Sequence, residues 1–153
     1  MGADAVKEYL DKHGLLERYL EFTASCATVD LAAQAIGCEA GRIAKTLSLR
    51  TKQGPVLIVA MGTSKIDNRK FKEYFGEKAS FIKPEDLENQ VGHPMGGVCP
   101  FAVSPEVRIY LDAGLREFDP VYPAAGTSNN VVRLSLAELE QISGGTWIDV
   151  CKY

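Results

Sequence analysis

The sequence lacks the usual patterns of a metal-binding protein. Its four cysteines are far apart and form no CxxC pair, and only two histidines are present. A zinc site needs several such ligands at short spacings, so we expect no metal and no other cofactor. Scattered, unpaired cysteines are typical of reducing compartments, and the simplest interpretation is a cytoplasmic protein.

Long hydrophobic runs are also missing. The most apolar run, residues 56–61, is much shorter than the roughly 20 residues that span a bilayer, and the charged N-terminal residues form no signal core. We therefore expect no membrane contact. The net charge of −3 at pH 7 argues against a broad surface for DNA or RNA. It does not exclude a small protein that binds one end of an RNA.

The remaining composition is that of an ordinary globular protein. Hydrophobic residues make up 46% and charged residues 24% of the 153 residues, which excludes a disordered or low-complexity chain. No repeat or internal linker is visible, so we predict a single domain over residues 1–153. Because strands and helices alternate irregularly, we predict an α+β fold with a mixed, largely antiparallel sheet or partly closed barrel and helices packed outside it.

Local signals predict most of the elements. Helical spacing and capping residues predict helices at residues 3–12, 28–37, 67–76 and 136–143, and a further helix beginning at Pro84. Alternating or apolar runs predict strands at residues 43–51, 56–61, 79–82, 107–111, 121–122, 131–135 and 146–150. The KQGP turn predicts a hairpin of the first two strands. Residues 15–22 fit either a helix or the beginning of a strand.

Residues 91–101, VGHPMGGVCPF, form the strongest candidate site loop, because three glycines and two prolines occur in eleven residues. Neither Gly96 nor Gly97 has a side chain, so a ligand could approach the main chain closely. Successive N–H groups there could converge on an anion or a developing oxyanion. The alternative is a tight connection between two elements.

Lys45 stands out within the strand predicted at residues 43–51. Side chains of a strand alternate between two faces, so Lys45 shares a face with Ile43, Leu47 and Leu49. An ammonium group facing a core is costly unless it reaches water or an anion. We expect this ammonium and the glycine loop to face a common cavity. The alternative is a lysine whose stem covers apolar surface while its head is solvated.

Other candidates carry weaker signals. Cys99 could be a nucleophile with His93 as its base, but a small buried thiol fits it better, and His93 fits a loop residue better. A basic cluster at Lys65, Arg69, Lys70 and Lys72 fits a solvated helix face, with contact to RNA phosphates as the alternative.

The motifs together resemble the YbaK/ProX family of freestanding aminoacyl-tRNA deacylases, relatives of the editing domain inserted in bacterial prolyl-tRNA synthetases. The resemblance covers nearly the whole chain and depends, in order, on TVDLAAQAIG, RIAKTLSLR, LIVAMG, KIDNRKFKEYFG, GHPMGGVCPFA and YPAAGTSNNVVRLSLAEL. It implies hydrolysis of the ester that joins a wrong amino acid to tRNA, in particular a proline tRNA. An aminoacyl-tRNA synthetase is a further candidate partner.

The resemblance also implies site residues. The strand lysine of the family, here Lys45, helps to hold the acylated terminal adenosine, and the glycine-to-proline loop, here residues 96–100, supplies N–H groups to the scissile carbonyl. A ribose hydroxyl of the substrate helps to activate the water. The catalytic candidates are thus Lys45, Gly96 and Gly97. The substrate-binding candidates are Thr28, Thr46, Met95, Ala124, Ala125 and Gly126.

One departure from the family concerns specificity. Members that act on cysteinyl-tRNA have a serine and two glycines where this chain has Ala124, Ala125 and Gly126. Cysteine specificity is therefore not carried over, and we expect a small non-proline amino acid such as alanine or serine. Two other functions stay open: a non-catalytic module of the same fold that binds aminoacyl-tRNA or a nucleotide, and a hydrolase that uses Cys99.

Overall fold

The structure of the protein is a computed structural model, and it describes residues 2–153. The α-helices are α1 (Ala3–Lys12), α2 (Val29–Ile36), α3 (Asn68–Phe75), α4 (Leu87–Gln90) and α5 (Leu136–Ser143). The strands are β1 (Tyr19–Glu21), β2 (Ile43–Thr51), β3 (Gly54–Met61), β4 (Lys65–Ile66), β5 (Arg108–Asp112), β6 (Tyr122–Pro123), β7 (Asn130–Val132), β8 (Thr146–Ile148) and β9 (Cys151–Lys152).

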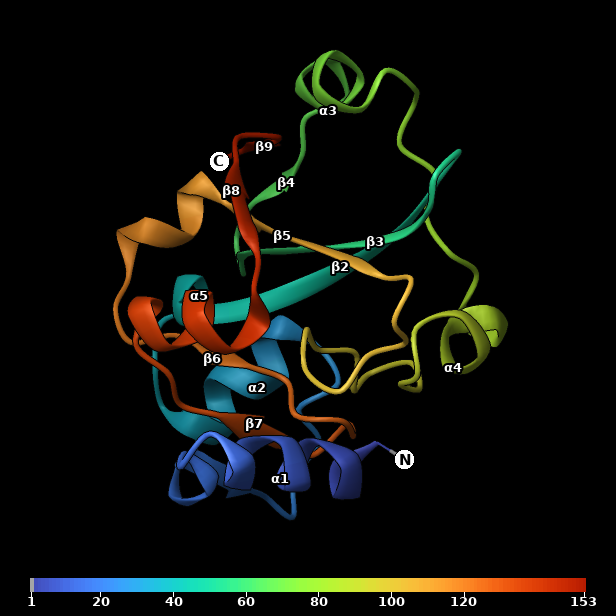
Figure 1. Cartoon of the computed structure of the whole chain (residues 1–153). Helices are drawn as coiled ribbons and strands as arrows, with labels where there is room; N and C mark the ends of the chain where they lie inside the picture. The colour runs from blue at the N-terminus through green and yellow to red at the C-terminus, as the bar shows by residue number, and fades with distance from the viewer. Residues whose placement is uncertain (1) are drawn as a thin grey trace.

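A curled sheet in the order β6-β2-β3-β5-β8 forms the centre of the molecule (Figure 1). The predicted α+β fold with a mixed sheet is confirmed, and so is the β2–β3 hairpin. The other three pairings in this sheet are parallel, so "largely antiparallel" is wrong for the central sheet. Two short ladders, β1–β7 and β4–β9, are antiparallel.

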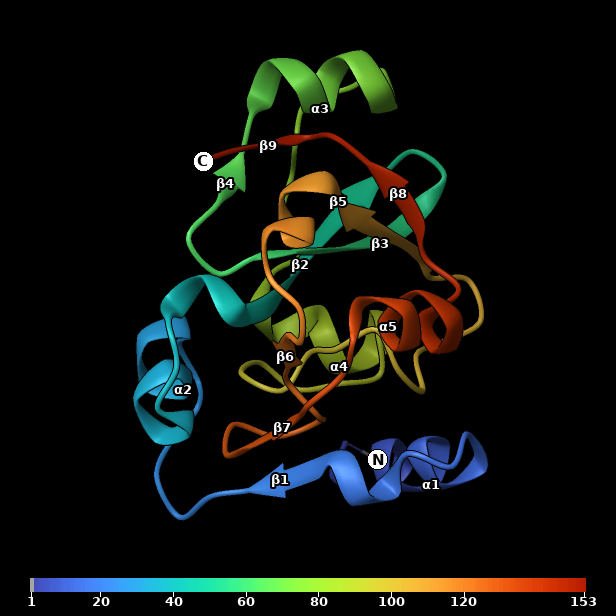
Figure 2. The ribbon, with the colours of Figure 1, turned by 90° about the vertical axis from the view of Figure 1, so that its left-hand side faces the viewer.

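Helices cover the sheet on both faces. Helix α3 lies on one side with β4 and β9, whereas α1, α2 and α5 lie on the other side (Figure 2). The core beneath α1 and α5 includes Leu10, Val59 and Leu139, and the core beneath α3 includes Ile58 and Phe71. Burial on both faces explains why β3 is a continuous apolar run instead of an alternating one.

The capping signals are confirmed. Thr28 accepts a hydrogen bond from the Leu31 N–H at 3.2 Å and begins α2, and Ser135 with Glu138 forms the predicted capping box of α5. Residues 15–22 contain a single 3-10 turn followed by β1. No helix within residues 2–153 is long and apolar enough to cross a membrane.

Two strand predictions need correction. Residues 79–82 are not a regular strand but make one antiparallel bridge to β2, between Phe81 and Leu49. The final segment contains two strands, because the chain turns after β8 and its last strand, β9, pairs with β4. The pattern in residues 146–150 gave no sign of this turn.

Candidate functional site

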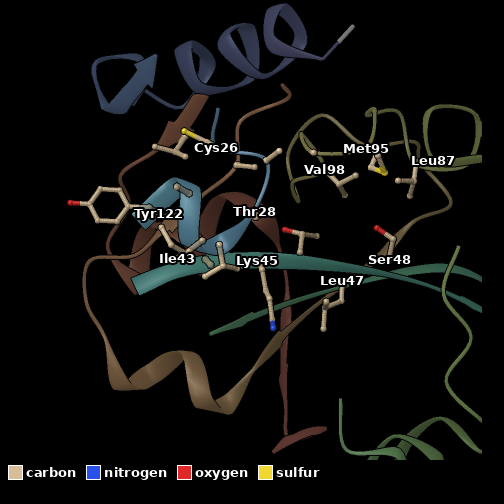
Figure 3. A pocket seen from close by; sticks show the side chains of 18 of the residues that line it. Cys26, Thr28, Ile43, Lys45, Leu47, Ser48, Leu87, Met95, Val98 and Tyr122 are labelled. Atoms are coloured by element: carbon tan, nitrogen blue, oxygen red, sulfur yellow. The ribbon is translucent and has the colours of Figure 1, made fainter. Parts of the chain in front are cut away.

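A cavity of about 290 Å³ lies beside β2, between the beginning of α2 and the glycine loop (Figure 3). The structure brings six of the predicted site residues together in its lining. They come from segments far apart in the sequence: Thr28, Lys45, Thr46, Met95, Gly96 and Ala124. The lining contains no aspartate, glutamate or histidine, so no side chain there is an obvious general base.

Gly96 and Gly97 have different roles in the glycine loop. Gly96 lines the cavity with a φ of 89°, in a region that favours glycine. Gly97 is buried outside the lining, and its N–H donates to the Pro94 carbonyl at 3.1 Å. Within residues 2–153 no acceptor is found for the N–H groups of Gly96 and Val98. In this structure the N–H groups without an acceptor are therefore those of Gly96 and Val98, whereas the N–H of Gly97 is already bonded, and its predicted role as a donor stays a prediction.

Three of the predicted residues serve packing. A Cβ atom on Gly97 would lie 2.4 Å from the Gly126 carbonyl carbon, and the Gly126 N–H donates to the Gly97 carbonyl at 3.0 Å. Ala125 is fully buried in the main core. Gly97, Ala125 and Gly126 do not line the cavity, and their predicted contact with substrate stays a prediction. These residues hold the glycine loop against the segment of residues 124–126.

The ammonium group of Lys45 does not face the glycine loop. Its Nζ donates to the Ser64 carbonyl, and Figure 3 shows Lys45 and Leu47 on the opposite side of β2 from Ser48 and Met95. Burial lowers the pKa of Lys45. Lys45 thus lines the same cavity as Gly96, but its ammonium group points away from the glycine loop, and its role at the site stays a prediction. Strand alternation correctly grouped Lys45 with Leu47, but it could not tell which face meets the loop.

Cys99 and His93 form a buried structural contact. Cys99 is completely buried, and burial raises the pKa of its thiol to about 12. The His93 Nε2 lies 2.6 Å from the Phe101 carbonyl and 3.5 Å from the Cys99 Sγ, and burial lowers the pKa of His93. Neither residue lines the cavity. The arrangement fits a packed thiol and a neutral histidine instead of a nucleophile and its base.

The basic cluster around α3 lies on the other side of the central sheet from α2 (Figure 2), and the beginning of α2 borders the cavity. Lys70 pairs with Asp149 at 3.0 Å, and Arg69 pairs with Glu73 at 3.2 Å. These pairings support a solvated helix face. Within residues 2–153 no cluster of three or more histidine, cysteine or acidic side chains could hold a metal ion.

Sequence analysis missed one polar residue of the cavity. Ser48 lines it and is nearly buried. The signal was available, because Ser48 follows Thr46 by two residues and therefore lies on the same face of β2. The Thr46 Oγ1 atom is buried, and it has no hydrogen-bond partner among residues 2–153. These two hydroxyl groups make the wall formed by β2 polar.

Known proteins resemble the chain over most of its length. Residues 23–142 match the family model described as "Aminoacyl-tRNA editing domain". "Uncharacterized protein YwhH" of Bacillus subtilis is 46% identical over 134 residues, which are 86% of this chain and 85% of that protein. "Putative Cys-tRNA(Pro)/Cys-tRNA(Cys) deacylase EbsC" of Enterococcus faecalis is 27% identical over 120 residues, which are 77% of this chain and 73% of that protein.

A solved structure shares the whole fold. The "crystal structure of a putative trans-editing enzyme for prolyl tRNA synthetase" superimposes with a TM-score of 0.89 and 29% sequence identity. The match covers 99% of this chain and 97% of that one. The likeness therefore includes the glycine loop, the helices on both sides of the sheet and the segment around Ala124.

Proposed function

The chain belongs to the family of aminoacyl-tRNA editing domains and is an aminoacyl-tRNA deacylase, and we propose that it removes a small non-proline amino acid from misacylated proline tRNA. The observation that carries this proposal is a cavity in which an open glycine loop faces a polar strand wall. In this proposal the chain acts in trans, after the synthetase has released the wrong product.

The size of the cavity supports a small amino acid. Alanine or glycine occupies five of its lining positions, at residues 27, 32, 44, 96 and 124. About 290 Å³ must also admit the terminal ribose. Selection by size is shallow, since one methylene changes binding by roughly 1 to 3 kcal/mol. We therefore expect alanine and serine to be accepted together.

The reaction proposed is attack of water on the ester carbonyl. The tetrahedral intermediate carries negative charge on the former carbonyl oxygen, and in this proposal it accepts hydrogen bonds from the N–H groups of Gly96 and Val98, which line the cavity and have no acceptor within residues 2–153. One such donor typically lowers the barrier by about 3 to 4 kcal/mol. The lining offers no carboxylate or imidazole, so a ribose hydroxyl of the substrate relays the proton in this proposal. It accepts a proton from the attacking water and passes its own proton to the departing ribose oxygen as the ester bond breaks, which leaves the free amino acid and the tRNA hydroxyl.

Lys45 stays in the proposal as the anchor of the acylated adenosine. This role requires its side chain to leave the Ser64 carbonyl. The cavity lining includes Lys45 and Leu47, whose side chains lie on the opposite side of β2 from Met95 (Figure 3), so in this proposal the cavity extends around the open edge of β2. A flexible four-carbon side chain beside that edge can bring a point charge toward the substrate.

A panel of charged tRNAs tests the proposal. The purified chain is incubated with proline tRNA carrying alanine, serine, cysteine or proline, and with the matching cognate pairs, and release of labelled amino acid is followed. We expect proline tRNA that carries alanine or serine to be hydrolysed at least tenfold faster than proline tRNA that carries proline. A mock preparation from cells without the chain controls for contaminating hydrolases.

The same panel separates the alternatives. Binding of aminoacyl-tRNA without release of amino acid would replace the enzyme with a binding module of the same fold. Faster hydrolysis of the cysteinyl ester than of the alanyl ester would refute the proposed specificity. A net charge of −3 gives little long-range attraction to RNA, so contact limited to the acceptor end, or a bound synthetase, supplies the affinity in this proposal.

A further inference from the structure

The edge of β2 that points away from β3 has a gap in its hydrogen bonding, one outward-bonding residue wide. Strand β6 pairs with this edge only at Ile43 and Ala44. Farther along, the Ser48 carbonyl accepts from the Ile82 N–H at 3.0 Å, and the Arg50 N–H donates to the Ser80 carbonyl at 2.7 Å. Between these two pairings the edge borders the cavity.

Thr46 lies in this gap. In a strand, main-chain groups of alternate residues point to the same edge. Since Ser48 and Arg50 bond outward, away from β3, Thr46 also turns its N–H and C=O outward. Within residues 2–153, neither group has a hydrogen-bond partner on that edge. The buried Thr46 Oγ1 also lacks a partner. A buried polar group is normally paired, so the buried Thr46 hydroxyl group, next to two main-chain groups without a partner on the same edge, indicates a ligand.

An aminoacyl ester offers the complementary groups. In an antiparallel pair, a residue can exchange two hydrogen bonds with the residue opposite, one through its N–H and one through its C=O. An esterified amino acid has an amino group and a carbonyl on either side of one Cα atom, as a residue in a strand has. Ligands that extend a sheet in this way gain affinity from main-chain hydrogen bonds.

We propose that the aminoacyl group of the substrate fills the gap as a one-residue extension of the sheet. Its α-amino group donates to the Thr46 carbonyl and Oγ1, and its carbonyl accepts from the Thr46 N–H. The carbonyl thereby faces the cavity that Gly96 also lines. This inference rests on the proposed function and names the group that Thr46 recognises.

Non-hydrolysable analogues test the inference without turnover. The first is an adenosine analogue in which an NH group replaces the 3′ oxygen and carries the alanyl group through an amide bond. The second carries a propionyl group, which removes only the amino group. Dissociation constants are measured by calorimetry for wild type, Thr46→Val and Thr46→Ser. A hydrogen bond to a charged or strongly polar group is worth about a tenfold to hundredfold change in affinity.

We expect wild type to bind the alanyl analogue at least tenfold more tightly than the propionyl analogue. Thr46→Val should weaken the alanyl analogue about tenfold and change the propionyl analogue less than twofold, whereas Thr46→Ser should behave as wild type. Equal weakening of both analogues by Thr46→Val, or no weakening, would overturn the proposal. Circular dichroism of both variants checks that they fold, and Thr46→Ser alone still tests retention of the hydroxyl.

Two further outcomes are informative. If adenosine alone binds as tightly as the alanyl analogue, and if Thr46→Val weakens both by the same factor, the gap holds the adenine base and the inference is wrong. If the alanyl preference is found but no charged tRNA is hydrolysed, the proposed function fails while the recognition of the amino group stands. If charged tRNA is hydrolysed but the alanyl analogue is not preferred, the proposed function stands and the recognition of the amino group by Thr46 is wrong.

Discussion

The two faces of β2 differ in whether their polar groups have hydrogen-bond partners. On the face under α3, the Lys45 Nζ donates to the Ser64 carbonyl, and the Ser64 Oγ donates to the Met61 carbonyl at 2.8 Å. Nearby, buried Asp112 accepts from the N–H groups of Gly114 and Val150, each at 3.0 Å. On the cavity face, the Thr46 Oγ1 has no partner among residues 2–153.

This difference separates folding from ligand binding. A buried polar group with all its hydrogen bonds made stabilises one arrangement of the chain, and loss of one partner is costly. A buried polar group without a partner lowers the stability of the folded protein. Such a group is expected where a bound ligand supplies the missing hydrogen bond. We therefore expect substitutions on the α3 face to change mainly stability and those at the cavity to change mainly turnover.

The largest effect should come from Asp112→Ala. Three donors, the N–H groups of Gly114 and Val150 and the hydroxyl of Tyr153, would lose their acceptor. An unsatisfied buried group costs about 1 to 3 kcal/mol, so the free energy of unfolding should fall by about 3 kcal/mol or more in urea titrations. Deacylation by the folded fraction should stay within twofold of wild type.

Asp149→Ala is the matched control for Asp112→Ala. Asp149 is exposed and pairs with Lys70 at the surface, where ion pairs contribute little. Its loss should leave the unfolding midpoint almost unchanged. The comparison between the two faces fails if Asp112→Ala is as mild as the control, or if it abolishes turnover in protein that remains folded.

Lys45→Ala tests the one residue that links the two faces. If the ammonium anchors the substrate, turnover should fall at least tenfold. Stability should fall by only about 1 kcal/mol, the usual worth of one hydrogen bond. Deacylation rates and urea titrations measure the two effects. Lys65→Ala, which removes an exposed lysine of β4, is the control. Near-normal turnover with reduced stability would make Lys45 a structural tie and remove it from the proposed site.

Much of the fold could be predicted from local chemistry. The capping box of Ser135 and Glu138 and the cap at Thr28 act within one helical turn, so the sequence alone specifies them. The parallel pairing of β3 with β5 joins Val56 to Arg108, and nothing local records that partnership. The last strand, β9, was missed for the same reason, because its partner β4 lies far back in the chain.

The site could be predicted in part. The glycine loop and the lining residues Thr28, Thr46 and Ala124 were found, because backbone freedom and family motifs mark them. The side on which Lys45 lies was not, since alternation gives the residues that share a face but not the neighbour of that face. The packing of Gly97 could not be predicted, because a missing side chain fits an approaching ligand or an approaching main chain equally well. In the structure the main chain of Gly126 lies against Gly97.

The smallest effect on turnover should come from Cys99→Ala. Because burial raises the pKa of this thiol to about 12, it stays protonated at neutral pH and is a poor nucleophile. Deacylation should therefore stay within twofold of wild type, while the small cavity left behind lowers the free energy of unfolding by about 1 kcal/mol. Native Cys99 should also resist iodoacetamide until the chain unfolds, whereas partly exposed Cys38 serves as the reactive control. A large loss of turnover on Cys99→Ala, in protein of normal stability, would place the chemistry in the core and end the distinction between the two faces.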